Sequence, residues 1–304
     1  MSKRVLIIGI NGYLGNALQA YLKKNARSVE VFGISRNPVN IKNTFSCNCL
    51  HQNKLRAIIR DLKPDIIFHL VGGRLKNQER LFKANFDTTL NLFQAVEQIE
   101  NYKPRIIIPG TAAEYGSPKG KRLLSEKSRC RPVSWYGFVK HLQTLISLDY
   151  AKHGQDIMVA RMFNIVGGGV PEPLAFGKFA KDIVLVEQKK IPPQLVTKNL
   201  SGKRDFCDID DVCRALWLIA QKGKKGQIYN ICSGRSSNIL ALLKQMLKCS
   251  RVKNIAIREV DQFASESFDV VGSYDKLQRL TGWKPRVSLK RSLQNTLQFY
   301  RKHI

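Results

Sequence analysis

Short runs of apolar residues alternate with longer segments of helical periodicity over the first half of the chain. Val5–Ile8 is a continuous aliphatic run, as expected for a strand that is covered on both faces of a parallel sheet. The pattern predicts further strands at 29–34, 44–47, 65–70, 105–108 and 157–162, and helices after residue 15 and at 54–62, 79–99 and 134–153. Repeated β-α-β units of this kind predict a doubly wound α/β sheet, which binds ligands at the carboxyl ends of its strands.

After about residue 170 the pattern changes to shorter, mixed elements. The predicted helices are 176–187, 210–221, 237–247 and two near the C-terminus, and the predicted strands are 228–231 and 255–257. We therefore expect a smaller, mixed α/β lobe that closes over a cleft at the edge of the sheet.

A glycine-rich turn connects the first predicted strand to the first predicted helix. Gly9, Gly12 and Gly15 have the spacing GxxGxxG. Gly9 allows a tight turn, Gly12 lets the backbone approach a pyrophosphate, and Gly15 lets the helix pack on the strand. Phosphates would then lie at the helix N-terminus, where free N–H groups favour negative charge. The context predicts a Rossmann cofactor-binding domain over 1–166, with a contribution from about 207–232, and a substrate lobe mainly over 167–304.

The second predicted strand ends in Ser35, Arg36 and Asn37. An NAD-binding fold usually has a carboxylate in this region, about 20 residues after the glycines, to bind the ribose 2′-hydroxyl. This chain has none there, and Arg36 could instead pair with a 2′-phosphate. The sequence therefore favours NADP(H), with NAD(H) still possible.

A Tyr and a Lys, Tyr136 and Lys140, lie at i and i+4, so both side chains share one face of a helix. A nearby ammonium lowers the pKa of a Tyr toward the working range, as general acid–base catalysis needs. Thr111 follows the strand predicted at 105–108, where it could donate a hydrogen bond to a substrate carbonyl beside Tyr136. Thr111, Tyr136 and Lys140 are therefore the candidate catalytic residues.

Composition places the chain among ordinary globular proteins. Its 304 residues can bury a sizeable core, and a hydrophobic content of 43% argues against disorder. No apolar run approaches the ~20 residues that a spanning helix needs. The residues before Val5 are too few for a signal peptide, so we expect a cytoplasmic protein. Seven Cys without a CxxC pair or a zinc-like His/Cys spacing indicate reduced thiols and no metal site.

The formal net charge of +28 is unusual. Such basicity favours nucleic acid, anionic surfaces or acidic ligands as partners. Lys and Arg are spread along the chain, with mild concentrations at 222–225 and 284–291, and no RNA-binding aromatic signature accompanies them. We interpret the charge as a solvated basic surface that would also attract polyanionic small ligands.

Taken together, these motifs resemble those of the extended short-chain dehydrogenase/reductases of the NAD-dependent epimerase/dehydratase family, which act on nucleotide-sugars. Within that group the chain is most similar to GDP-4-keto-6-deoxy-D-mannose reductases and related 4-ketoreductases. The resemblance runs nearly end to end. The motifs that carry it are the three glycines, 65–70, Asn85, 111–116, Tyr136 with Lys140, 161–167, Asn199-Leu200, 203–206, 210–212, 229–234, and Lys276-Leu277 ahead of 281–285.

The resemblance implies NADPH-dependent reduction of the 4-keto group of a nucleotide-linked 4-keto-6-deoxy sugar, of the GDP-4-keto-6-deoxymannose type, in deoxysugar and lipopolysaccharide precursor biosynthesis. Tyr136 would protonate the forming alkoxide, Thr111 would hydrogen-bond the carbonyl oxygen, and Lys140 would lower the Tyr pKa and hold the nicotinamide ribose.

The same resemblance implies the residues that bind the two ligands. The cofactor-binding residues are Gly9, Asn11, Gly12, Tyr13, Leu14, Gly15, Ser35, Arg36, Asn48, Cys49, Leu70, Val71, Gly72, Asn85, Tyr136, Lys140, Phe163 and Val166. The substrate-binding residues are Gly73, Arg74, Thr111, Asn164, Lys178 and Arg204. Of these, Arg204 and Asn164 would hold the pyrophosphate of the nucleotide-sugar.

The sequence departs from the dehydratase relatives next to Thr111. Those relatives place acidic residues two or three positions before the Tyr that corresponds to Tyr115, where this chain has Ala112 and Ala113. Water elimination is therefore not expected, and Glu114 is expected to point elsewhere. Two further departures concern ligands: Asn48 replaces the Asp usually set against the adenine, and the segment 261–269 lacks the Arg-Pro of the reductases.

Two alternatives remain open at this point. A nucleotide-sugar 4-epimerase with retained NAD(P) would use the same fold and the same residues. A non-catalytic RNA-binding protein of the same fold is less favoured, because such a module has no need of the whole Thr111, Tyr136 and Lys140 set. The resemblance also implies a homodimer through the helices at 79–99 and 134–153.

Overall fold

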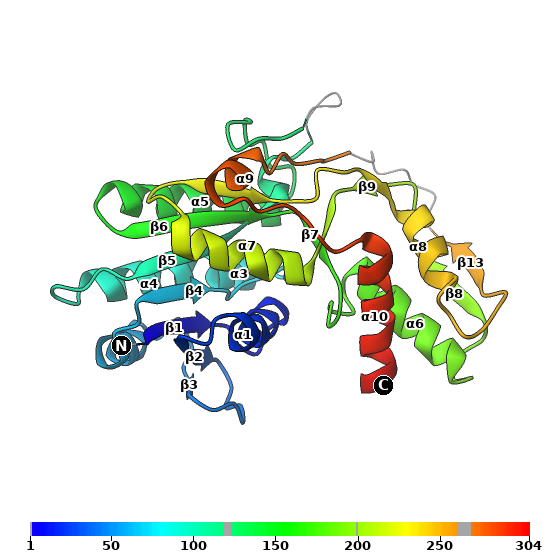
Figure 1. Ribbon diagram of the computed structural model, residues 1–304, viewed down its shortest axis with the longest axis horizontal. Helices are drawn as coiled ribbons and strands as arrows, with labels where there is room; N and C mark the ends of the chain where they lie inside the picture. The colour runs from blue at the N-terminus through cyan, green and yellow to red at the C-terminus, as the bar shows by residue number, and fades with distance from the viewer. Residues whose placement is uncertain (1, 118–122, 199, 261–268) are drawn as a thin grey trace.

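The computed structural model describes residues 2–117, 123–198, 200–260 and 269–304 (Figure 1). Asn199 and nearly all of the segment 261–269, both used in the sequence comparison above, lie outside the described residues.

A seven-stranded parallel sheet forms the centre of the larger part of the molecule, in the order β11-β6-β5-β4-β1-β2-β3. Its strands are β1 (Lys3–Ile8), β2 (Val29–Ser35), β3 (Thr44–Ser46), β4 (Ile66–His69), β5 (Arg105–Thr111), β6 (Asp156–Met162) and β11 (Ile228–Ile231). The strand order reverses between β1 and β4, which is where open α/β sheets bind their ligands. The doubly wound parallel sheet predicted from the sequence is confirmed.

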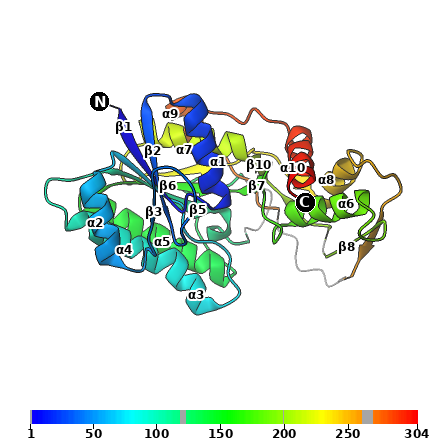
Figure 2. The same ribbon diagram turned by 90° about the horizontal axis from the view of Figure 1, so that it is seen from below.

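Helices cover both faces of this sheet, as Figure 2 shows from below. Side chains alternate along each strand, so Val5 and Ile7 belong to one apolar cluster while Leu6 and Ile8 belong to the other. The first cluster is closed by α1 (Tyr13–Asn25), α7 (Ile209–Lys222) and α9 (Asp275–Thr281). The second is closed by α2 (Gln52–Leu62), α4 (Thr88–Glu97) and α5 (Trp135–Lys152).

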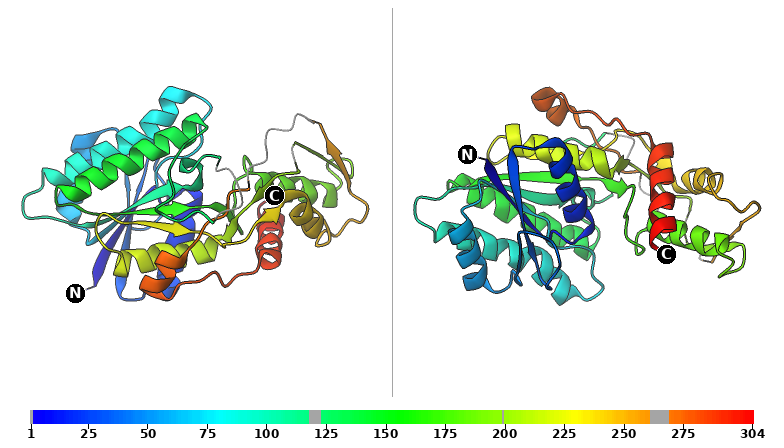
Figure 3. Two further views of the ribbon diagram at one scale, coloured as in Figure 1. Left: turned by 90° about the horizontal axis from the view of Figure 1, so that it is seen from above. Right: turned by 60° about the horizontal axis from the view of Figure 1, so that its bottom comes forward.

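A second, smaller lobe has its own apolar cluster. Its elements are α6 (Ala175–Glu187), α8 (Ile239–Leu247), α10 (Leu289–His303) and the parallel pair β8 (Gln194–Thr197) and β13 (Ala256–Glu259). Figure 3 shows α10 standing where this lobe meets the sheet. Two short pairs adjoin it: β7 (Asn164–Val166) with β10 (Phe206–Asp208), and β9 (Lys203–Arg204) with β12 (Ser237–Asn238).

More of the C-terminal half of the chain belongs to the part that contains the large sheet than the sequence predicts. The segment from β10 to β11 returns to the sheet, near the predicted 207–232. The helix α9 also returns, since Leu277 and the fully buried Trp283 pack in the cluster with α1 and α7. This second return was not predicted, because nothing in the local pattern of a seven-residue helix indicates its packing partner.

Several element boundaries differ from the predicted ones. The helix expected at 79–99 is α3 (Gln78–Phe82), a π-helical turn η1 (Lys83–Asp87) and α4 in succession. The hydroxyls of Thr88 and Thr89 donate to carbonyls four residues earlier, which is one way in which the i→i−4 ladder is disturbed. The helix expected at 237–247 begins at Ile239, because residues 237–238 pair with β9 and Asn238 caps the helix.

None of the helices in the described ranges is both long and apolar enough to cross a membrane.

Candidate active site

The turn after β1 brings backbone rather than side chains to the edge of the sheet. Gly9 has φ +89°, a conformation that favours glycine, and a Cβ on Gly15 would lie 2.1 Å from the Gly9 carbonyl oxygen. At the start of α1, Gly12 provides no side-chain cap, and the first turn contains no acidic residue. The N–H groups at this helix end are therefore available to a phosphate, which is the fit that a dinucleotide cofactor requires.

A cavity of about 660 Å³ opens at the carboxyl ends of β1, β2 and β4, beside this turn. Of the residues predicted to bind the cofactor, those that line it are Gly9, Asn11, Gly12, Arg36, Asn48, Cys49, Leu70, Val71 and Gly72. No carboxylate lines it among the described residues, whereas Arg36, Arg80 and Lys83 do. The lining suits an anionic ligand of dinucleotide size.

Other predicted cofactor residues occupy the packing around the cavity instead of its lining. Phe163 belongs to a small apolar cluster with Tyr115, and Val166 belongs to the core of the smaller lobe. Ser35 is buried at the end of β2, and Tyr13, at the start of α1, packs against the first cluster of the sheet and against the cluster of the smaller lobe. Leu14 and Gly15 likewise join α1 to the sheet.

Sequence reasoning missed Arg80, Lys83 and Thr88, which line the same cavity from α3, η1 and α4. These residues follow the glycine loop after β4, so their position next to the cavity depends on where the helix begins. The sequence did contain a signal for these residues. A helix that begins at the carboxyl end of a strand lies at the edge of the sheet where the cavity opens. Lys83 is partly neutralised, since its Nζ lies 2.6 Å from Glu79 Oε1.

The loop after β4 is held in place by Asn85, which was predicted to bind the cofactor. Its Oδ1 accepts the Gly73 N–H at 3.1 Å, and its Nδ2 donates to the Gly73 carbonyl at 3.1 Å. A Cβ at Gly72 would lie 2.4 Å from this amide oxygen, so glycine is required there. Asn85 is buried, and its contacts fix the loop that lines the cavity.

Thr111 and Tyr136 meet at the carboxyl end of β5. Thr111 is the last residue of that strand, and its side chain lies close enough to the Tyr136 phenol to affect the pKa of that phenol. Ser134 caps α5 by accepting the Gly137 N–H at 3.1 Å. A Cβ at Gly137 would lie 2.5 Å from the Ala113 carbonyl oxygen, so α5 approaches the end of β5 very closely. The predicted hydroxyl pair is therefore brought together in the fold.

The pKa of Tyr136 is raised, whereas the sequence predicted that it would be lowered. Burial of the phenol is the main cause and raises the pKa, whereas Arg74 and the neighbouring Thr111 side chain lower it. The Arg74 guanidinium lies 5.3 Å from the centre of the Tyr136 ring. The net pKa is raised because a buried phenolate loses more hydration energy than it gains from Arg74 and Thr111.

Lys140 has different partners from those expected. It is buried, and its Nζ donates to the Pro109 carbonyl and to Gln143 Oε1. Burial lowers the pKa of this ammonium to about 8, while Glu114 opposes the shift. Arg74, not Lys140, is the cation that opposes the rise in the pKa of Tyr136.

Gln143 connects this ammonium to the glycine loop. Its Nε2 donates to the Asn85 carbonyl at 2.9 Å and to Thr89 Oγ1 at 2.6 Å. A continuous buried chain of hydrogen bonds therefore runs from β5 through α5 to the loop after β4. Such a chain keeps the two sides of the cavity in register.

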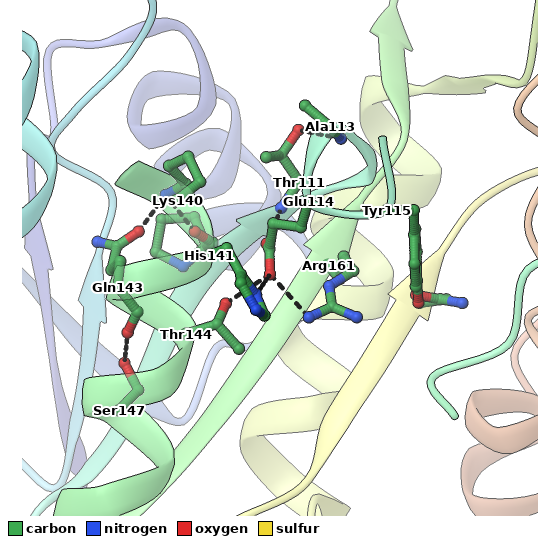
Figure 4. Close-up of polar contacts among 12 residues, drawn as sticks. Thr111, Ala113, Glu114, Tyr115, Lys140, His141, Gln143, Thr144, Ser147 and Arg161 are labelled. Carbon is green, nitrogen blue, oxygen red and sulfur yellow. Dashed lines mark hydrogen bonds and ion pairs between the residues drawn. The ribbon is translucent and has the colours of Figure 1, made fainter. Parts of the chain in front are cut away.

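Glu114 points away from the cavity, as expected, into a buried polar cluster (Figure 4). Its Oε1 accepts the Thr111 N–H at 2.7 Å, and its Oε2 accepts Thr144 Oγ1 at 2.8 Å and Arg161 Nη2 at 2.7 Å. Burial alone would raise the pKa of this carboxyl, yet His141, Arg161 and the Thr111 N–H together hold it below its usual value. The carboxylate therefore fixes the turn that carries Thr111.

Cys130 and His141 lie beside this carboxylate, and one ligand atom from each of the three residues lies within 4.8 Å of the others. Three such groups can hold a metal ion. Here the Arg161 guanidinium already pairs with Glu114 and lies 4.6 Å from the centre of the Tyr115 ring. A metal ion would be repelled by this adjacent positive charge, so we assign the cluster a structural role.

The residues predicted to bind substrate are only partly brought together. Arg74 lies over Tyr136 and is close enough to Arg204 to contribute to lowering its pKa, although burial is the larger cause. Asn164 donates through Nδ2 to the Asp205 carbonyl at 2.9 Å. Lys178 is paired with Asp182 one turn along α6, so it is a neutralised cation at this position.

Comparison with known proteins agrees with this geometry. A family model described as the NAD dependent epimerase/dehydratase family matches residues 5–232. The chain is 25% identical to GDP-6-deoxy-D-mannose reductase of Pseudomonas aeruginosa, over 98% of this chain and 97% of that protein. It is also 25% identical to UDP-glucose 4-epimerase of Mycoplasma genitalium, over 98% of this chain and 96% of that protein.

Solved structures show the same overall fold. The structure of RMD from Pseudomonas aeruginosa complexed with NADPH superimposes with a TM-score of 0.86 at 25% identity, over 99% of this chain and 100% of that one. A UDP-glucose 4-epimerase from Thermotoga maritima with UDP-glucose gives a TM-score of 0.85 at 21% identity, over 99% of both chains.

Proposed function

Because the chain belongs to the NAD dependent epimerase/dehydratase family, we propose that it reduces the 4-keto group of a nucleotide-linked 4-keto-6-deoxy sugar with NADPH. The observation that carries this proposal is the meeting of Thr111 and Tyr136 at the sheet edge where the cofactor-sized cavity opens. Ala112 and Ala113 leave no acid for dehydration, because the only nearby carboxylate, among the described residues of this turn, is the buried Glu114. The similarity to GDP-6-deoxy-D-mannose reductase supports a GDP-linked substrate.

A bound nicotinamide cofactor would supply the hydride. The glycine turn and the start of α1 would hold its phosphates, and the loop fixed by Asn85 would line the cavity that it occupies. Tyr136, whose raised pKa keeps it protonated at neutral pH, donates the proton to the forming alkoxide. Thr111 Oγ1 hydrogen-bonds the same oxygen. Lys140 braces β5 against α5 through the Pro109 carbonyl.

Arg36 supports NADPH over NADH, because it lines the cavity at the end of β2. We expect Arg36→Ala to weaken NADP⁺ binding by about tenfold to a hundredfold, with NAD⁺ binding almost unchanged, since a charge-assisted contact is worth about 1.5–3 kcal/mol. Titration of both cofactors by protein fluorescence would measure this. Arg27→Ala, an exposed arginine outside this cavity, is the matched control. Equal losses for both cofactors would contradict the role of Arg36.

Arg74 should set the ionisation of Tyr136. Removing the guanidinium by Arg74→Ala leaves burial less opposed, so we expect the pKa of Tyr136 to rise further. NMR of protein labelled at the Tyr ring Cζ would follow the titration, with the resonance assigned by its loss in Tyr136→Phe. Lys76→Ala removes an exposed cation from the same loop and should leave the titration unmoved. A fall in the Tyr136 pKa in Arg74→Ala would exclude this role.

The reaction can be tested by NADPH consumption with GDP-4-keto-6-deoxymannose, made in place by a dehydratase, beside the dTDP- and CDP-linked keto sugars. Stoichiometric oxidation with one of them, followed by NMR of the product, would identify the nucleotide and the configuration at C4. The second candidate is a 4-epimerase, which the similarity to UDP-glucose 4-epimerase favours. It would interconvert nucleotide sugars with tightly retained cofactor and without net NADPH consumption.

We also propose that the enzyme is a cytoplasmic homodimer that pairs through α4 and α5. Three large apolar side chains of α5, Trp135, Phe138 and Leu145, are at least 42% exposed in the single chain. Sedimentation equilibrium would test the dimer, and a monomer mass would exclude it.

A further inference from the structure

A second cavity, of about 670 Å³, lies in the smaller lobe between α8 and α10. Figure 1 shows α10 beside the large sheet and α8 farther out in the smaller lobe, and the two helices contact each other. Its lining shares no residue with the cofactor cavity, which is built from residues 9–88. Leu297, fully buried on α10, contributes to the lining. We call this the α8–α10 groove.

The polar side chains that line the α8–α10 groove, among the described residues, are cations, amides and one thiol. Four of its residues are cations, and no carboxylate lines it among the described residues. Arg301 is neutralised, because Nε and Nη2 donate to the two oxygens of Glu187. Lys248, Lys290 and Arg291 have no side-chain partner in the part of the chain that the structure describes. The groove therefore has an excess of about three positive charges.

Three side-chain amides stand among these cations, Gln245 on α8 and Gln294 and Gln298 on α10. Within the described chain their amide groups also make no protein hydrogen bond. An amide N–H beside an ammonium or a guanidinium adds directed donors to the charge, which is the combination that binds phosphate oxygens. Aromatic side chains are absent from the described lining, so it offers no surface on which a base could stack.

The positions of Lys290 and Arg291 are unfavourable for the helix itself. Both lie in the first turn of α10, which contains no acidic residue, and cations there oppose the helix dipole. Both are also exposed and lack an ion-pair partner in the described residues, so they do not stabilise the fold through a contact. They coincide with the basic concentration at 284–291 that the proposed reaction leaves unexplained.

We propose that the α8–α10 groove is a second anion site that binds a small molecule carrying two or three linked phosphates, such as a nucleoside di- or triphosphate. The linked phosphates would lie between Lys248 and the pair Lys290 and Arg291, with the glutamine amides hydrogen-bonded to their oxygens. The size of the groove is typical of small-ligand sites, and its lack of aromatic side chains favours recognition of the phosphates over the base. This site is separate from the proposed reaction, since it shares no residue with the cofactor cavity.

The test is calorimetric titration of the full chain, saturated with NADPH, with inorganic tripolyphosphate at low and physiological salt. We expect one site per chain, and a loss of affinity of about tenfold to a hundredfold in the double variant Lys290→Glu, Arg291→Glu. The matched control is Lys222→Glu, Lys225→Glu, which makes the same change of net charge at the other exposed basic concentration and should bind as the wild type does.

Three results would overturn this proposal. Equal weakening in both double variants would show that the overall charge alone attracts the anion. Binding of tripolyphosphate to the cofactor-free chain but not to the chain saturated with NADPH would place it in the cofactor cavity. Retention of a single-stranded oligonucleotide in place of tripolyphosphate, lost in the Lys290 and Arg291 variant, would assign the groove to nucleic acid. Unchanged NADPH binding by the variants shows that they are folded, whatever the outcome of the sugar assay.

Discussion

Replacing Tyr136 by Phe is expected to reduce kcat for the proposed keto-sugar reduction by about 10²–10⁴, because this phenol is the proposed proton donor. The substitution removes one oxygen and keeps the half-buried ring that Arg74 contacts. NADPH affinity should therefore change little. Steady-state kinetics together with cofactor titration would separate the two effects.

The control for this variant is Tyr150→Phe. Tyr150 lies on the same helix and contacts Phe93 through its ring, and its hydroxyl makes no hydrogen bond with the described residues. It should retain wild-type turnover. Near-full turnover in Tyr136→Phe would end the assignment of this residue as general acid, and Thr111→Val would then show whether the hydroxyl of β5 acts alone.

Replacing Glu114 by Ala is expected to lower the free energy of unfolding by about 3–5 kcal/mol, because the buried Arg161 guanidinium would lose its counter-charge. The variant also leaves the Thr111 N–H and the Thr144 hydroxyl without their acceptor. Urea unfolding would measure the loss. The double variant Glu114→Gln, Arg161→Met removes both charges and should be more stable than Glu114→Ala. If Glu114→Ala is as stable as the wild type, the pair does not hold this part of the fold.

The same pair predicts a dependence of stability on pH. The pKa of Glu114 is lower in the folded chain than its usual value, so its contribution is present above about pH 4.3 and is lost as the pH falls through the folded pKa. Unfolding of the wild type should therefore become easier in this acidic range, and the dependence should be shallower in the double variant. A slope that is identical in the two proteins would assign the acid sensitivity to other carboxylates.

The candidate site could be predicted from the sequence only where its signals are local. The three glycines between β1 and α1 and the Tyr136–Lys140 spacing are read directly from neighbouring residues, and the structure places them at one sheet edge. The role of Lys140 is different, because its carbonyl partner, Pro109, lies 31 residues away along the chain. The side-chain spacing gives the face of the helix but not the atoms that this face meets.

Long-range packing also decided which charges act on each other. Glu114 and Arg161 are 47 residues apart in sequence and 2.7 Å apart in the fold. Arg74 reaches the Tyr136 ring from a different strand end. The rise in the Tyr136 pKa follows from its burial, which no property of residues 134–140 reveals. A pKa depends on the dielectric environment and the neighbouring charges, and both are set by residues distant in sequence.

The sequence by itself determined the seven strands of the large sheet, the helices between them and the glycine turn, because side-chain period and turn chemistry are properties of a few adjacent residues. Only the tertiary structure decided the return of α9 to the sheet, the partners of Lys140 and Glu114, and the meeting of α8 with α10. Those features arise from the burial of surfaces that come together only when the whole chain folds, so no local pattern contains them.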